Sequence, residues 1–303
     1  AYMIETNEKK ITFLDTPGHA AFSQMRARGS NVTDIIILVV AADDSVNDQT
    51  IEAISHAKAS KCPVIVAVNK IDLPNANPEK VEADLMPHEI ISEKMGGENV
   101  FVKVSAKKKT GIEDLIEAIL LQSEILELKA NYDRKAEGVV IESKIEKGRG
   151  PVISVLVQKG KLNVGDVVIA GKEWGKVRAL SDDEGKRLKI AFPSFPVEVL
   201  GLSGAPEAGD EFVVVENESR AREVTQYRDR LKKVRNNSSL KRGTVDQMIS
   251  DASSDVSTEF PIIIKADVHG SKEAIEQSLL KLDVAEVKIK ILHTGVGEIN
   301  ESD

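Results

Sequence analysis

The sequence predicts a multidomain chain that joins a parallel α/β sheet to an antiparallel β-barrel, a linker helix and a partial α/β domain. Two observations predict this. Apolar runs alternate with helix-like segments over the first third of the chain, and short strands punctuated by glycine turns follow from Glu137. The 303 residues are enough for two or three domains of ordinary size. The expected divisions are residues 1–130 for the α/β domain, 131–218 for the barrel, 219–257 for the connecting helix and linker, and 258–303 for the last domain.

The first domain contains four short apolar runs of the kind found in strands that are buried on both faces of a parallel sheet. The runs are Ile11–Leu14, Asp34–Ala41, Pro63–Val68 and Val100–Val104. Helices are expected at Asp48–Ser60, Pro78–Lys94 and Gly111–Leu128. Because strand and helix alternate, all four strands are expected to lie in one parallel sheet. This sheet would open without a first βα unit, so further residues are expected upstream of Ala1.

The barrel is expected to extend to about Asn217. Ser219–Lys241 is predicted to form one charged helix, broken near Asn236–Ser239, and Asp251–Ser257 to form a linker. The narrow apolar stripe of that helix consists of Val224, Tyr227, Leu231 and Val234. A strand, a helix and a strand then follow at Phe260–Asp267, Ser271–Leu282 and Val287–His293. One βαβ unit is too small to bury its own faces, so the last domain is expected to continue beyond Asp303.

The composition is that of an ordinary globular protein, with 41% hydrophobic and 30% charged residues. No apolar run approaches the roughly 20 residues that cross a bilayer. The first residues also lack the pattern of a secretory signal. The single cysteine, Cys62, cannot form an internal disulfide. We therefore expect a cytoplasmic protein with no membrane segment, and a monomer, since nothing in the sequence indicates oligomerisation.

The net charge of −8 argues against a protein that binds nucleic acid over its whole surface. The charge is uneven, because Arg220–Arg242 contains nine Lys or Arg against two acids, which gives a local charge of +7. Two interpretations stay open for this stretch. It is either a connector helix with charge on all sides, or a helix whose excess charge lies on RNA phosphates.

The loop after the first predicted strand carries residues that suit phosphate and metal binding. It reads Asp15-Thr16-Pro17-Gly18-His19. A carboxylate at the C-terminal end of a strand can hold a metal ion in the crevice where α/β sheets bind ligands. Glycine at position 18 lets a backbone N–H approach a phosphate without a Cβ in the way.

The loop after Pro63–Val68 reads Asn69-Lys70-Ile71-Asp72. An Asn amide followed three residues later by a carboxylate can read one edge of guanine, since the carboxylate accepts hydrogen bonds from the ring N–H and the exocyclic amine. The competing interpretation is a polar turn capped by Asn and Asp.

A third loop, Ser105-Ala106-Lys107, follows the Val100–Val104 strand and would alone indicate only a helix N-cap. Its value lies in its position, because three loops follow three predicted parallel strands at the same edge of the sheet. We therefore expect the loops that bear Asp15, Asn69 and Ser105 to converge around a purine nucleotide.

These three strings resemble the third, fourth and fifth motifs of GTPases. His19, where small GTPases have glutamine, narrows the resemblance to translational GTPases. The flanking residues resemble the bacterial translation initiation factor 2 family in particular, over essentially the whole chain. They include Arg26-Ala27-Arg28-Gly29, Glu173-Trp174-Gly175-Lys176-Val177-Arg178 and Phe260-Pro261-Ile262-Ile263. The resemblance implies a P-loop-GTPase-like sheet and a factor that uses GTP to bind the ribosome, place initiator fMet-tRNA, join the subunits and then hydrolyse GTP.

The resemblance also implies roles for single residues. Asp15 would hold Mg²⁺ through water, the Gly18 amide would sense the γ-phosphate, and His19 would orient the attacking water as the catalytic residue. Asn69 and Asp72 would read the guanine of GTP or GDP. The implied nucleotide-binding residues are Asp15, Thr16, Pro17, Gly18, His19, Asn69, Lys70, Asp72, Ser105, Ala106 and Lys107.

The sequence departs from the GTPase pattern, since it has no G-x-x-x-x-G-K-[ST] phosphate loop and no threonine-bearing first switch before Asp15. A chain of these residues alone is therefore expected to bind nucleotide weakly and to hydrolyse none. The implied partners are the ribosomal subunits with their RNA, and initiator tRNA through a domain beyond Asp303. Two alternatives stay open: an elongation or selenocysteine-type factor, against which the final βαβ unit argues, and a non-catalytic ribosome-binding module.

Overall fold

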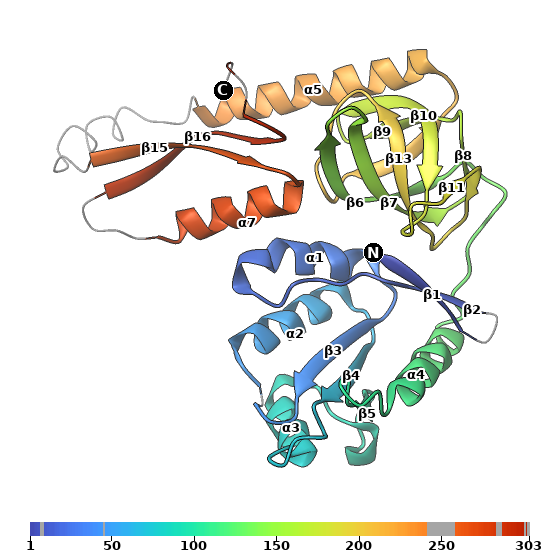
Figure 1. Cartoon of the computed structure of the whole chain (residues 1–303), viewed down its shortest axis with the longest axis vertical. Helices are drawn as coiled ribbons and strands as arrows, with labels where there is room; N and C mark the ends of the chain where they lie inside the picture. Colours follow the sequence, from blue (N-terminus) through green and yellow to red (C-terminus); the bar gives the residue numbers. More distant parts are fainter. Residues whose placement is uncertain (7–8, 45, 241–257, 283–286, 300, 302–303) are drawn as a thin grey trace. The chain divides into compact units, whose positions relative to one another are not determined.

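The computed structural model describes residues 1–6, 9–44, 46–240, 258–282, 287–299 and 301 (Figure 1). The chain forms two compact units. The sheet unit is Thr16–Lys129, and the barrel unit combines Ala1–Asp15 with Ala130–Asp303.

The sheet unit is built on three parallel strands in the order β3-β4-β5. These strands are β3 (Ile36–Ala41), β4 (Val64–Asn69) and β5 (Val100–Lys103). The helices are α1 (Ser23–Val32), α2 (Asp48–Ser60), α3 (Pro78–Leu85) and α4 (Ile112–Ile125), with short 3-10 helices η1 (Ala20–Phe22), η2 (Met86–His88) and η3 (Glu93–Met95). Val66 and Val68 on the central strand are fully buried with Leu85 of α3 in one apolar core, which confirms the predicted parallel α/β domain.

Two predictions about this domain are wrong. The run Ile11–Leu14 does not join the parallel sheet, because β2 (Lys9–Phe13) pairs with β1 (Tyr2–Thr6) in a separate antiparallel hairpin. β1 lies only two residues before β2 in the sequence, so its backbone groups can pair with β2 locally. The helix predicted over Pro78–Lys94 ends at Leu85, since Pro87 has no N–H to continue it.

The barrel of the barrel unit confirms the glycine-punctuated pattern. Six antiparallel strands close in the order β10-β13-β7-β6-β14-β9, because β9 pairs back to β10. The strands are β6 (Glu137–Glu146), β7 (Gly150–Lys159), β9 (Val167–Ala170), β10 (Glu173–Ser181), β13 (Pro196–Leu202) and β14 (Glu211–Val215), with short strands β8 (Leu162–Asn163), β11 (Arg187–Leu188) and β12 (Ile190–Ala191) beside them. Phe212, Ile153 and Leu180 fill the interior and are fully buried.

The β1–β2 hairpin lies against the barrel. The Met3 N–H donates to the Asp183 carboxylate at 2.9 Å, and Thr12 Oγ1 donates to the Ser194 carbonyl. The Lys10 ammonium lies 5.1 Å from the centre of the Phe195 ring, which is a cation–π distance. These contacts hold the segment just before Asp15 in the barrel unit.

Helix α5 (Glu218–Leu240) packs on the barrel through small side chains near its N-terminus. Ala221 and Thr225 are buried, and Arg228 Nη1 donates to the Gly171 carbonyl at 2.8 Å. The apolar stripe of this helix is largely exposed. Three of the four residues of the predicted apolar stripe face solvent, with exposed fractions of 63% for Tyr227, 51% for Leu231 and 66% for Val234.

The predicted break at Asn236–Ser239 is wrong, because the helix continues to Leu240. Asn and Ser each cost at most about 0.7 kcal/mol in a helix relative to alanine, and neither glycine nor proline occurs within α5.

The last described elements are β15 (Thr258–Ala266), α7 (His269–Leu280) and β16 (Val287–Val296). β15 and β16 are parallel, with Ile262 opposite Ile291, so the βαβ prediction is confirmed. The predicted linker at Asp251–Ser257 lies outside the described residues, and the four domain divisions stay a prediction. Among the described helices, none has both the length and the apolar character that a bilayer span requires.

Candidate functional site

The loops that follow β4 and β5 lie together and are joined by side-chain hydrogen bonds. Ser105 is fully buried, and its hydroxyl donates to Asp72 Oδ1 at 2.6 Å while it accepts from the Lys108 N–H at 3.1 Å. The Asn69 side-chain oxygen accepts from the Ala106 N–H at 3.1 Å and from the Lys70 N–H at 2.7 Å. Each loop therefore fixes the polar side chains of the other.

The strand register explains why these loops meet. Val68 lies opposite Lys103 in the parallel pair β4–β5, so both strands end at the same level. The Ile71 N–H then donates to the Val104 carbonyl at 3.4 Å, and Ser105 exchanges two backbone hydrogen bonds with Thr110 at 2.9 and 3.2 Å.

A hydrogen bond and nearby positive charges favour the ionised form of Asp72. The hydrogen bond from Ser105 is the largest cause that lowers the pKa of Asp72, and it outweighs the opposing effect of desolvation. The positive charges of Lys108 and Lys107 lower the pKa further. A carboxylate has about four lone-pair sites, so Asp72 retains acceptor capacity beyond the bond from Ser105.

The arrangement fits one edge of a guanine base. An ionised carboxylate and a side-chain amide lie on adjacent loops, and hydrogen bonds between the loops set their orientations. Lys70 has left-handed backbone angles, with φ of 62°, and its ammonium lies 3.1 Å from Asp43 at the end of β3. Lys107 is exposed on the same rim.

The loop that carries His19 is placed elsewhere in the sheet unit. Pro17, Gly18 and His19 are exposed, and Thr16 is partly buried. A Cβ built on Gly18 would lie 3.7 Å from Gln49 Oε1, which is ordinary contact, and Gly18 has no positive φ. Neither sterics nor backbone strain therefore requires glycine at this position.

The structure thus brings together Asn69, Lys70, Asp72, Ser105 and Ala106, as the sequence predicts. The hydrogen bonds and ion pairs of the described residues do not link this cluster to Thr16–His19. The cluster contacts Asp43, just after β3, through Lys70, whereas Gly18 lies near Gln49 in the first turn of α2. Asp15 belongs to the other compact unit, so the convergence of its loop with the Asn69 and Ser105 loops stays a prediction.

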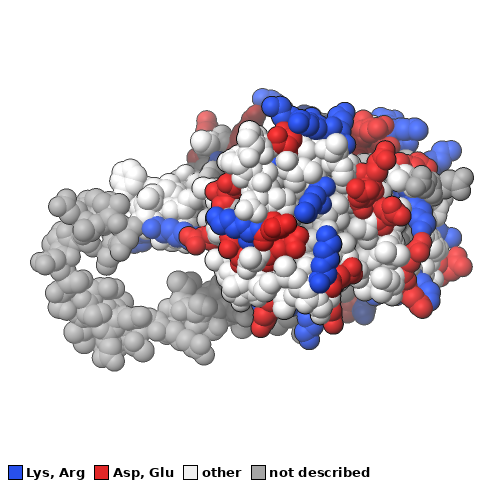
Figure 2. Space-filling view, turned by 90° about the horizontal axis from the view of Figure 1, so that it is seen from below, with Lys and Arg blue, Asp and Glu red and all other residues white. Residues whose placement is uncertain are grey.

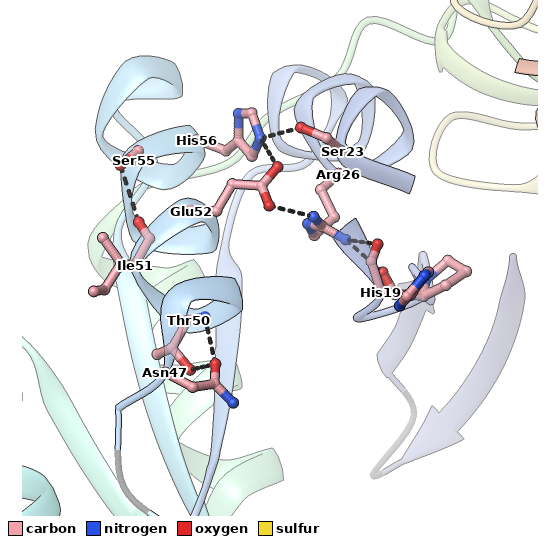
Figure 3. Close-up of polar contacts among 10 residues, drawn as sticks. His19, Ser23, Arg26, Asn47, Thr50, Ile51, Glu52, Ser55 and His56 are labelled. Carbon is pink, nitrogen blue, oxygen red and sulfur yellow. Dashed lines mark hydrogen bonds and ion pairs between the residues drawn. The ribbon is translucent and has the colours of Figure 1, made fainter. Parts of the chain in front are cut away.

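Sequence reasoning missed a second polar network, which holds the His19 loop (Figure 3). Arg26 of α1 is only 8% exposed, and its Nη1 donates to the carbonyls of Pro17 and His19, both at 2.8 Å. Its Nη2 donates to Glu52 Oε2 of α2 at 2.7 Å. Desolvation is the largest effect on the pKa of Glu52 and would raise it, but the Ser23 hydrogen bond and the Arg26 charge and hydrogen bond together lower it.

The only signal for this network in the sequence is the pair Glu52 and His56, four residues apart on one helix face. The start of α2 is fixed by Asn47, whose side chain accepts from the Thr50 N–H at 2.9 Å. The partner Arg26 lies on α1, a polar helix that the apolar pattern does not reveal.

Within the part of the chain that the structure describes, no three His, Cys, Asp or Glu side chains cluster at metal-binding distances. Mg²⁺ commonly takes one or two carboxylates together with waters and substrate phosphates. The single carboxylate of Asp15 fits that pattern.

Family profiles match three consecutive parts of the chain. The Elongation factor Tu GTP binding domain matches residues 1–124, Elongation factor G domain 2 matches residues 135–215, and Translation-initiation factor 2 matches residues 234–303.

Among solved structures, GDP-bound aIF5B from Aeropyrum pernix has a TM-score of 0.59 at 22% identity, covering 94% of this chain and 53% of that one. A bacterial selenocysteine-specific elongation factor EF-Sec has a TM-score of 0.57 at 24% identity, covering 70% of this chain and 37% of that one. At these identities the likeness concerns the fold.

Curated relatives match the entire chain much more closely. Translation initiation factor IF-2 of Rhodospirillum rubrum is 57% identical over 100% of this chain and 35% of its own length. The corresponding factor of Mesorhizobium japonicum is 58% identical over 100% of this chain and 36% of its own length. The chain therefore spans about a third of the length of these relatives, and it belongs to the translation initiation factor IF-2 family.

Proposed function

We propose that this chain is the guanine-reading and ribosome-docking part of a GTP-dependent translation initiation factor, and that the whole protein hydrolyses GTP. The observation that carries the proposal is the mutual locking of the Asn69–Asp72 and Ser105–Ala106 loops. Because hydrogen bonds between the loops orient Asp72 and Asn69, these side chains would lose little conformational entropy when a guanine base binds.

In this proposal Asp72 accepts from the guanine ring N–H and exocyclic amine, and the Asn69 amide contacts the same base. Lys70 exchanges its contact with Asp43 for a position along the base face. Ser105, Ala106 and Lys107 support the base from the neighbouring loop.

The phosphates of the nucleotide would be bound by the loop Asp15–His19. The Gly18 amide senses the γ-phosphate, Thr16 and Pro17 shape the turn, and Asp15 holds Mg²⁺, which neutralises phosphate charge when bound. His19 orients the attacking water as the catalytic residue of the whole protein.

The proposed partners are the ribosomal subunits, and initiator fMet-tRNA in the whole protein, which would act in the cytoplasm. Acidic and basic side chains are intermingled on the face shown in Figure 2, so any RNA contact would be local. Helix α5 is better explained as a connector, because two of its basic residues, Arg222 and Arg228, already contact the barrel. Arg228 bonds Gly171, and the Arg222 guanidinium lies 5.1 Å from the centre of the Trp174 ring.

The experiment that tests guanine recognition uses the chemistry of Asp72. In Asp72→Asn, one of the two acceptor oxygens becomes an NH2 donor, which would face the exocyclic amine of guanine and lose that contact. Xanthine instead offers a carbonyl at this position, which can accept from the new donor. We expect the wild-type chain to prefer guanosine over adenosine and xanthosine diphosphates in equilibrium binding of labelled nucleotides. We expect the variant to prefer xanthosine diphosphate by about tenfold or more.

Asp44→Asn is the matched control, because it makes the same change at an exposed carboxylate of the same unit. It should retain the wild-type order of preference. Equal binding of guanosine and adenosine diphosphates by the wild-type chain would contradict the proposal.

A further inference from the structure

Arg26 constrains the backbone on both sides of Gly18. One nitrogen, Nη1, donates to the carbonyls of Pro17 and His19, each at 2.8 Å. The Phe22 N–H also donates to the His19 carbonyl, at 2.9 Å. The exposed residues Gly18 and His19 are therefore held through their neighbours' main chain.

The guanidinium is itself anchored to a different helix. Arg26 Nη2 lies 2.7 Å from Glu52 Oε2, and Glu52 Oε1 lies 3.4 Å from His56 Nε2. His56 Nε2 is in turn 3.3 Å from Ser23 Oγ of α1 (Figure 3). The network thus connects the His19 loop, α1 and α2.

The chemistry of this network indicates that Arg26 fixes the geometry of the His19 loop more than it stabilises the fold. A guanidinium has donors in a rigid planar fork, so it fixes directions that a single ammonium cannot fix. Arg26 Nε is buried without a hydrogen-bond partner among the described residues, so the desolvation of this charge is only partly compensated. Replacing the whole pair by apolar groups would cost little stability, whereas removing Glu52 alone would leave the buried Arg26 charge without its partner. The pair is therefore better suited to specifying geometry than to adding net stability.

We propose that Arg26 is a positioning residue for the loop that carries His19, and that Glu52 couples this loop to helix α2. The consequence for hydrolysis rests on the proposed function: loss of the Arg26–Glu52 pair leaves nucleotide binding intact but removes His19 from its working position.

The first test measures the loop itself and needs no nucleotide. Backbone ¹⁵N order parameters of Gly18 and His19 are compared in the wild-type chain, Arg26→Lys and Glu52→Gln. The wild-type order parameters are expected to be about 0.85, which is typical of a rigid backbone. In both variants the order parameters of these residues should fall below about 0.6. Residues of β4 should stay unchanged, because a loss of global stability alone does not alter fast motion in the native state.

The matched control is Glu89→Gln. Glu89 is 80% exposed and pairs with Lys58 of α2 at 2.6 Å, so this variant removes an ion pair of the same helix without touching Arg26. Its order parameters should equal those of the wild type. A mobile loop in the wild-type chain, or an unchanged loop in the folded Glu52→Gln variant, overturns the proposal.

The second test uses the whole protein. Glu52→Gln is expected to lower kcat for GTP hydrolysis about tenfold or more while the affinity for GDP stays within about twofold. An unchanged kcat beside a loosened loop overturns the catalytic role. A failure of guanine selectivity at Asp72 would instead refute the proposed function, and the order parameters would still decide whether Arg26 positions the loop.

Discussion

Ser105 shows how one small side chain can organise a recognition site. It is fully buried, donates to Asp72 and accepts from the Lys108 N–H, so both capacities of its hydroxyl are used between two loops. Ser92 is buried in the same unit, yet its hydroxyl has no hydrogen-bond partner among the described residues. The two serines have similar burial and opposite bonding, which makes them a matched pair.

This contrast predicts the effect of Ser105→Ala on Asp72. The hydrogen bond from Ser105 is the largest cause of the lowered pKa, so its removal should raise the pKa of Asp72 toward the ordinary 3.8. A ¹³C NMR titration of the side-chain carboxyl measures this shift. Ser92→Ala should leave the titration unchanged, and an equal shift in both variants would contradict the assignment.

Glu52 gives a prediction about pH. Its folded-state pKa lies below the ordinary 4.5, so its contribution to stability is fully present above about pH 4.5 and is lost as the pH falls through the lower folded-state value. At pH 7, Glu52→Gln should lower the free energy of unfolding of the sheet unit by about 1–3 kcal/mol. Urea unfolding at several pH values measures this difference. It should shrink toward acid pH, and a difference that grew instead would show that Glu52 is not stabilised as the anion.

At the scale of elements, Gly111 determines how closely α4 can begin behind β5. Its φ is 72°, and a Cβ at this position would lie 2.2 Å from the Lys103 carbonyl oxygen. Gly96 has a similar φ of 83°, but a Cβ there would have no atom within 4 Å. A side chain would be strained by the backbone at both positions, but only at Gly111 would it also overlap with other atoms.

Gly111→Ala should therefore destabilise the sheet unit by about 1–3 kcal/mol more than Gly96→Ala. The left-handed backbone costs both variants about 1–2 kcal/mol, and only Gly111→Ala also pushes α4 away from the sheet. Chemical denaturation of the two variants gives the difference directly. Equal losses of stability in the two variants would mean that the N-terminus of α4 can move away from β5 without a cost in free energy.

The elements that could be predicted are those with local signals. Helix α2 has the predicted bounds Asp48–Ser60, because Asn47 caps its start and its apolar residues repeat at helical spacing. Helix α1 was missed, because its sequence is polar and carries Gly29 without an apolar stripe. The sheet membership of the strand predicted at Ile11–Leu14 was also misjudged, since an apolar run identifies a strand but not its partner.

The same division applies to the candidate site. The meeting of Asn69 with the Ser105 loop follows from parallel strands that end at one edge, so spacing and strand order were enough to predict it. The contact between Arg26 and Glu52 joins two helices across 26 residues of sequence, and no motif marks it. Long-range polar pairs of this kind depend on helix packing, which a single sequence does not specify.

At the scale of the whole molecule, the two compact units have separate apolar cores. The core of the barrel centres on Phe212, and that of the sheet unit on Leu85. Both side chains are fully buried, and the two clusters share no residue. A domain with its own core can unfold as its own cooperative unit.

We therefore expect two transitions in differential scanning calorimetry of this chain, each sensitive to one core. Phe212→Ala should lower only the barrel transition, and Leu85→Ala only that of the sheet unit. Each truncation of a buried side chain costs about 2–5 kcal/mol, which corresponds to a fall of about 10 °C or more for domains of this size. Leu121→Ala is the control, since Leu121 is 58% exposed and should shift neither transition appreciably. A single transition that both core variants lower equally would show that the barrel and the sheet unfold together, and that separate cores do not make separate cooperative units in this chain.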